Sequence, residues 1–136
     1  MRDIELLIVH CSAVRPSQTS SAAQIAAWHR AQGWLDIGYH YVIRRDGTIE
    51  KGRPEHLTGA HCHGHNLHSI GICYEGGLDE HGTPADTRTP QQKTALFTLL
   101  RELKTRYPHA KIFGHHHLDP TKACPCFDAA AEYSRL

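Results

Sequence analysis

The sequence lacks any apolar run long enough to cross a lipid bilayer. The most apolar stretch near its start, residues 4–9, has six residues and is interrupted by Glu5, whereas a membrane-spanning helix needs about 20 apolar residues. The same stretch is too short for the apolar core of a secretory signal. We therefore expect synthesis in the cytoplasm without a signal peptide, free thiols and no membrane insertion.

The chain also lacks a strong charge of either sign and the compact signatures of several enzyme classes. Its 15 basic and 14 acidic residues leave a formal net charge of +1, which predicts no nucleic-acid-binding surface. No Gly-rich phosphate loop, GxSxG or HExxH sequence is present. Internal repeats and linkers are absent as well, so residues 1–136 predict a single domain, which we expect to be a monomer.

Histidine, in contrast, is far more abundant than packing requires, with 13 residues in 136. Histidine is the commonest metal ligand in proteins. The five cysteines do not form a CxxC…CxxC pattern. We expect Cys11, Cys62 and Cys73 to be packing residues, and a disulfide between Cys124 and Cys126 would be strained.

Apolar periodicity and turn residues predict an α/β fold. We expect strands at residues 4–10, 39–44, 48–51, 69–74 and 111–114, and helices at 21–32, 91–107 and 128–134. Asp46-Gly47 predicts a tight hairpin. The first strand is apolar on both faces, which is typical of the middle of a covered sheet. The order of elements predicts a single domain with a central mixed β-sheet flanked by helices on both faces.

Two strand ends and one cysteine predict a metal site. His10 ends the first strand, and strand ends are where open α/β sheets place ligands. His115, His116 and His117 follow the last strand, and Cys124 comes nine residues after His115. Two imidazole nitrogens and one thiolate would leave the fourth position of a zinc ion open for water, which is the catalytic arrangement. The alternative for His10 is a core histidine bonded to the backbone.

A second histidine cluster lies in the loop before the fourth strand. If the segment were extended, His61, His63 and His65 would line one face and could hold a metal. Because the segment lies between loop signals and contains Gly64, a wall of a substrate groove is the stronger interpretation.

Tyr39 and Lys122 are near the metal candidates along the chain. Lys122 precedes Cys124 by two residues, so in an extended chain both side chains would point the same way. A cation there could stabilise an oxyanion at the metal. The residues alone favour the plainer alternatives, which are a half-buried strand tyrosine and a surface lysine.

Six short segments occur in an order that resembles one enzyme family. They are IVHCSA (8–13), WHR with QGW (28–34), GYHY (38–41), RDGT (45–48), SIGI (69–72) and KACP (122–125). They are similar to segments of the phage lysozyme-type N-acetylmuramoyl-L-alanine amidases, zinc enzymes related to the peptidoglycan recognition proteins. The resemblance implies a mixed sheet flanked by helices and zinc held by His10, His115 and Cys124, with Tyr39 and Lys122 assisting catalysis.

The choice among the adjacent histidines depends on the alignment. Matching Gly114-His115 and the segment 118–120 favours His115, whereas counting back from Cys124 without a gap favours His116. We assign His115, since a shift of one residue would turn Leu118 to the wrong face.

The resemblance implies a peptidoglycan hydrolase of the endolysin type, from a phage or prophage. Such an enzyme uses zinc-activated water to cut the amide between N-acetylmuramic acid and the L-alanine of the stem peptide, and acts on the cell wall after release or delivery. We expect residues 58–66 to line its groove. A non-catalytic peptidoglycan-binding module on the same fold is the alternative, but such relatives typically lack the cysteine ligand. A histidine-rich metal-storage or metal-sensing protein is a weaker alternative, and it predicts several metals per chain.

Overall fold

A single five-stranded sheet forms the centre of the protein. The computed structural model describes residues 2–136, and its strands have the order β3-β2-β4-β1-β5. Neighbouring strands are parallel except for β2 and β3, which are antiparallel, so the sheet is mixed as predicted. The strands are β1 (Leu6–Cys11), β2 (Tyr41–Ile43), β3 (Ile49–Lys51), β4 (Ser69–Tyr74) and β5 (Lys111–Gly114).

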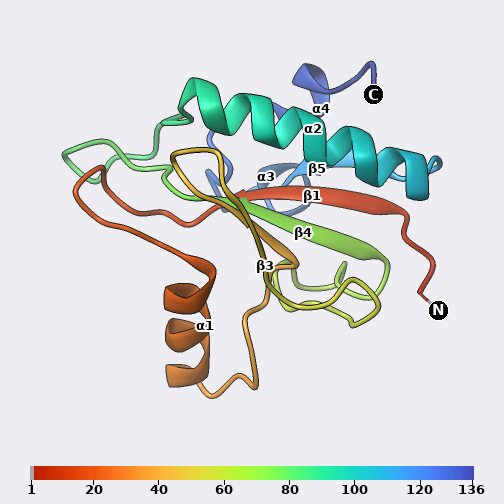
Figure 1. The fold of residues 1–136 in the computed structure, drawn as a ribbon, viewed down its shortest axis with the longest axis horizontal. Coiled ribbons are helices and arrows are strands. Elements are labelled where there is room, and N and C mark those ends of the chain that lie inside the picture. The colour runs from red at the N-terminus through yellow and green to blue at the C-terminus, as the bar shows by residue number, and fades with distance from the viewer. Residues whose placement is uncertain (1) are drawn as a thin grey trace.

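Helices cover both faces of this sheet (Figure 1). α1 (Ala22–Ala31) lies on one side, and α2 (Pro90–Arg106) lies along the other. α3 (His115–Leu118) follows β5 directly, and α4 (Ala129–Glu132) packs against β5. The predicted fold class is therefore confirmed. None of the helices within residues 2–136 combines the length and apolarity that a bilayer crossing requires.

The two cores follow from the alternation of side chains in the strands. In β1, Leu7 and Val9 belong to the larger core, which α2 completes with four buried leucines. Cys73 of β4 belongs to the smaller core beneath α1, together with Ile25. His10 is paired with Cys73 in the parallel register and is only 1% exposed. The first strand is thus covered on both faces, as its composition predicts.

A capping box and a buried amide position α2. The Thr89 side chain accepts a hydrogen bond from the Gln92 N–H, and the Gln92 side chain accepts one from the Thr89 N–H. The Gln92 amide also donates to the carbonyls of Ile43 and Glu75, at 3.2 and 2.9 Å. One side chain therefore both caps the helix and attaches it to the ends of β2 and β4.

Glu75, directly after β4, connects several segments through its buried carboxylate. It is 2% exposed and accepts hydrogen bonds from the backbone N–H groups of Ser20 and Arg45. Its carboxylate also pairs with the Arg44 guanidinium at 3.2 Å. Burial alone would raise the pKa of Glu75, but these donors outweigh it, so the pKa lies below its ordinary value of 4.5.

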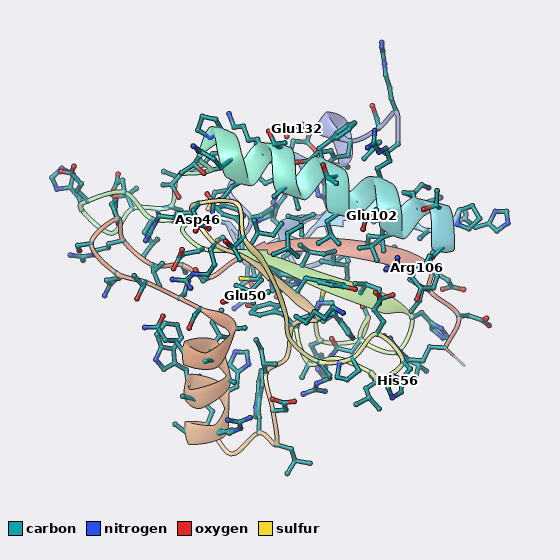
Figure 2. All side chains as sticks on the ribbon, viewed as in Figure 1. Asp46, Glu50, His56, Glu102, Arg106 and Glu132 are labelled. Carbon is teal, nitrogen blue, oxygen red and sulfur yellow. The ribbon has the colours of Figure 1, made fainter. Side chains whose placement is uncertain are left out.

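The hairpin between β2 and β3 has the tight turn that Asp46-Gly47 predicts. The Asp46 carboxylate accepts a hydrogen bond from the Thr48 N–H at 2.9 Å, and Gly47 has a φ of +89°. Figure 2 shows Glu50 of β3 on the side of the sheet toward α1. The Glu50 carboxylate accepts from the N–H of Ala22 at 2.8 Å, so the hairpin holds the first turn of α1.

One element, α3, is missing from the sequence prediction. Residues 115–118 form a helical turn, whereas the choice of His115 over His116 relied on the alternation of an extended chain. That argument is wrong, because side chains in a helix follow a period of 3.6 residues and not 2. The assignment of His115 has to rest on its contacts instead. Elsewhere the predicted elements are present, with shorter bounds for β2 and α4.

Candidate metal centre

The parallel register of the sheet brings His10 and His115 together. β1 pairs with β5 so that Val9 lies opposite Gly114. A histidine follows each of these two residues in the chain. His10 lies near the end of β1 and His115 begins α3, so both lie at the carboxyl edge of the sheet, where open α/β sheets bind ligands. The centroids of the two imidazole rings are 4.6 Å apart.

Cys124 completes a group of three possible metal ligands with these histidines. One ligand atom from each of His10, His115 and Cys124 lies within 4.8 Å of the others, and no other such group is found in residues 2–136. The backbone N–H of Cys11 donates a hydrogen bond to Cys124 Sγ at 3.1 Å. Two nitrogens and one sulfur fit zinc, and three protein ligands leave a coordination position open.

The two histidines next to His115 are engaged elsewhere. The N–H of His116 donates to the Cys124 carbonyl at 2.8 Å, and its Nδ1 lies 3.2 Å from the same oxygen. His117 Nδ1 accepts a hydrogen bond from the Gly114 N–H at 3.1 Å, and its Nε2 lies 3.2 Å from the Asp128 carboxylate. Of the three neighbours, His115 is therefore the one that shares a metal-sized group with His10 and Cys124.

The surroundings favour neutral imidazoles in this group. Burial, followed by the nearby rings of His61 and His115, lowers the pKa of His10 well below its ordinary value of 6.5. Burial also lowers the pKa of His115, where Asp119 opposes the shift and Lys122 adds to it. Only a neutral imidazole offers a nitrogen lone pair to a metal, so the charge environment suits metal binding.

Tyr39 lies against the same group. Its ring centroid is 5.1 Å from that of His10, and the side chain is half-buried. Burial, with smaller effects of the thiols of Cys73, Cys124 and Cys11, raises the pKa of Tyr39 well above 10. The phenol therefore keeps its proton at neutral pH and can act as a hydrogen-bond donor.

Lys122 lies in a turn at the rim of the group and is exposed. Its N–H donates to the Asp119 carbonyl at 3.0 Å, which closes a turn that ends at Lys122, and a second turn follows, in which the Cys126 N–H donates to the Ala123 carbonyl at 2.8 Å. The charge of Lys122 acts on the site, since it contributes to the lowered pKa of His115.

Comparison with known proteins identifies the family. A family model described as N-acetylmuramoyl-L-alanine amidase matches residues 1–127 of the 136. The chain belongs to this amidase family. The resemblance inferred from the six sequence segments is therefore confirmed.

Several individual proteins are similar to this amidase. The endolysin of Enterobacteria phage K11 is 49% identical over 120 residues, which cover 88% of this chain and 79% of the endolysin. Among solved structures, the N-acetylmuramoyl-L-alanine amidase LysC from Clostridium intestinale has a TM-score of 0.81 and 30% identity, covering 97% of this chain and 83% of its own. A Drosophila PGRP-LB mutant in complex with tracheal cytotoxin has a TM-score of 0.79 at 26% identity, covering 99% and 82%.

His61 is the residue whose place in the amidase the sequence interpretation missed. The sequence predicts a groove wall or a metal ligand there, and neither includes a contact with His10. In the structure His61 Nδ1 lies 2.8 Å from His10 Nε2, with the two rings edge to face. Burial, followed by the influence of His40 and His115, lowers the pKa of His61 to about 3. His63, by contrast, is exposed, so the alternating histidines of this loop do not share one surface. No sequence pattern signals the contact with His10.

Proposed function

We propose that this chain is a zinc-dependent peptidoglycan hydrolase that cleaves the amide between N-acetylmuramic acid and the L-alanine of the stem peptide. The observation that carries the proposal is the group of His10, His115 and Cys124, whose ligand atoms lie within 4.8 Å of one another. Membership of the amidase family, the phage endolysin relatives and the tracheal cytotoxin complex of a structural neighbour support the same substrate.

The three ligands would hold zinc at the carboxyl edge of the sheet. When bound there, zinc supplies a Lewis acid and lowers the pKa of a bound water to about 7. His10 and His115 would contribute neutral nitrogens. Cys124 would contribute its sulfur, which accepts a hydrogen bond from the Cys11 N–H. Because the set has three members, it leaves room for water and for the carbonyl of the substrate.

Tyr39 and Lys122 would act beside this centre. Tyr39 keeps its proton, so its hydroxyl can donate a hydrogen bond that orients the attacking water or the lactyl carbonyl. Lys122 carries a positive charge at the open rim, where it can stabilise the oxyanion that forms on the carbonyl oxygen. We propose both residues as catalytic, with Lys122 acting mainly in the transition state.

Product analysis and zinc analysis together test the proposal. The wild-type protein should clear cells whose outer membrane has been stripped, and a chelator should stop the clearing. Mass spectrometry should find the muramic acid–alanine amide cut in defined muropeptides. Cys124→Ser should lose both zinc and hydrolysis, because a hydroxyl is a poor replacement for a thiolate ligand.

Two further variants separate the roles. Lys122→Ala should retain zinc and lose about 10²–10³-fold in turnover, which is the usual effect of removing one oxyanion-stabilising donor. His63→Ala, in an exposed histidine outside the group, should retain zinc. Binding to peptidoglycan without hydrolysis by the zinc-loaded wild type would contradict the proposal and favour a binding module. Full turnover by Lys122→Ala would remove that residue from the mechanism.

A further inference from the structure

We propose that His61 is a positioning residue that holds the ring of His10 in the tautomer and orientation required for metal binding. This inference rests on the proposed function, because it takes His10 to be a zinc ligand. It starts from the 2.8 Å contact between His10 Nε2 and His61 Nδ1.

The proton in this contact determines which nitrogen of His10 is available. A neutral imidazole has one N–H and one lone pair, and a single proton joins the two facing nitrogens. If His61 supplied it, the proton of His10 would lie on Nδ1 and would block that atom. If His10 Nε2 supplies it, the Nδ1 lone pair of His10 is free for a metal. Within residues 2–136 no hydrogen bond to His10 Nδ1 is found, so this nitrogen is not committed to another partner.

Ser69 lets His61 act as the acceptor. When His61 Nδ1 accepts from His10, the proton of His61 lies on Nε2, which is 3.1 Å from Ser69 Oγ. A hydroxyl oxygen can accept this bond, so both nitrogens of His61 have a partner. Ser69 is the first residue of β4 and is fully buried. Metal-ligating histidines almost always donate their second N–H to a hydrogen-bond acceptor, ordinarily a carboxylate, a backbone carbonyl or water, which fixes the ring and increases its basicity. Here His61 Nδ1 takes the place of that acceptor.

Two glycines make room for the His61 ring against the sheet. A methyl group at Gly71 would lie 2.6 Å from ring atoms of His61, and one at Gly59 would lie 2.8 Å from the same ring. Gly71 is paired with Ile8 in the register, two residues before His10 on the same face of the sheet. The His61 ring therefore lies over Gly71, between Ser69 and His10 on this face of the sheet. The space is free because neither Gly71 nor Gly59 has a side chain.

The loop that carries His61 is also anchored. The Asn66 side-chain oxygen accepts hydrogen bonds from the N–H groups of both His61 and Cys62, each at 2.9 Å. The Cys62 side chain is buried. The backbone on both sides of the His61 Cα is thus fixed, which limits the directions that its imidazole can take. This arrangement is what a positioning role requires.

The test compares three variants by their zinc affinity, measured in competition with a chelator. His61→Leu keeps a bulky side chain but has no acceptor, and should bind zinc about 10–100-fold more weakly. His61→Asn places an amide oxygen the same number of bonds from Cα as Nδ1, and should recover most of the affinity. His63→Leu makes the same change at an exposed histidine of the same loop, and should bind zinc like the wild type.

A second measurement uses the zinc-loaded wild-type protein and does not depend on the folding of any variant. Nitrogen NMR of the histidine rings should find the His10 proton on Nε2, hydrogen-bonded to His61 Nδ1. A proton on Nδ1 of His10 would overturn the proposal, and so would equal zinc affinity of the leucine and asparagine variants. If the wild type bound no zinc at all, the proposed function itself would fail, which is a different result.

Discussion

Replacing Gly71 by alanine tests directly how the His61 ring is held over β4. The added Cβ would lie 2.6 Å from two ring carbons of His61, whereas carbon atoms in contact are ordinarily about 3.5–4.0 Å apart. The ring would therefore have to move by about 1 Å. Gly71 does not have a positive φ, so the backbone itself accepts alanine. The clash with His61 is then the main cost of the substitution.

Two opposing effects set the size of the change in stability. Overpacking of this kind costs about 1–3 kcal/mol. Alanine in place of glycine within a strand contributes about 0.5–1 kcal/mol in the other direction, because it has less freedom in the unfolded chain. The single variant alone cannot separate them. In a His61→Ala background the clash disappears, so there Gly71→Ala should be neutral or stabilising.

A double-mutant cycle isolates the clash. Urea unfolding of the four metal-free proteins should give a coupling energy between positions 61 and 71 of about 1–3 kcal/mol. Metal-free protein is needed because bound zinc would add its own stabilisation. A coupling below about 0.5 kcal/mol, which is the usual error of additivity, would refute the reasoning. It would mean that the His61 ring does not lie against Gly71.

Two further predictions concern the fold. Leu100→Ala, in the fully buried face of α2, should lower the free energy of unfolding by about 2–5 kcal/mol in urea, and an unchanged stability would contradict the described core. The folded-state pKa of Glu75 is lowered, so its carboxylate stabilises the protein above the unfolded value of about 4.5, and that contribution is lost as the pH falls through the folded pKa. Glu75→Gln should therefore lose less stability than the wild type when unfolding is compared between neutral pH and about pH 3. An identical acid dependence would show that Glu75 is not the group responsible.

Local sequence rules predicted most elements because their causes are local. Ser21 with Gln24 forms the capping box of α1, and Thr89 with Gln92 forms that of α2. α3 escaped prediction because its four residues have no such signal. A hydrogen bond to a residue outside the turn helps to hold it, since the His116 N–H donates to the carbonyl of Cys124.

For the candidate metal centre, too, the sequence predicted some features and only the structure decided others. The chemical identity of the candidate ligands could be read from the sequence, because imidazole nitrogens and a thiolate suit zinc wherever the chain places them. Choosing His115 over its neighbour needed the structure, where His116 faces the Cys124 carbonyl. The two turns that flank Lys122 also needed it, because no residue pattern in the sequence predicted them.

By itself, the sequence determined all the elements except α3, the mixed α/β class and the side chains able to hold a metal, because each depends on neighbouring residues or on the chemistry of a single group. The tertiary structure alone decided that His61 meets His10 across 51 positions of the chain. That contact depends on the loop folding over Gly71, and on the absence of a side chain there. Such complementarity between distant surfaces leaves no periodic trace in the sequence.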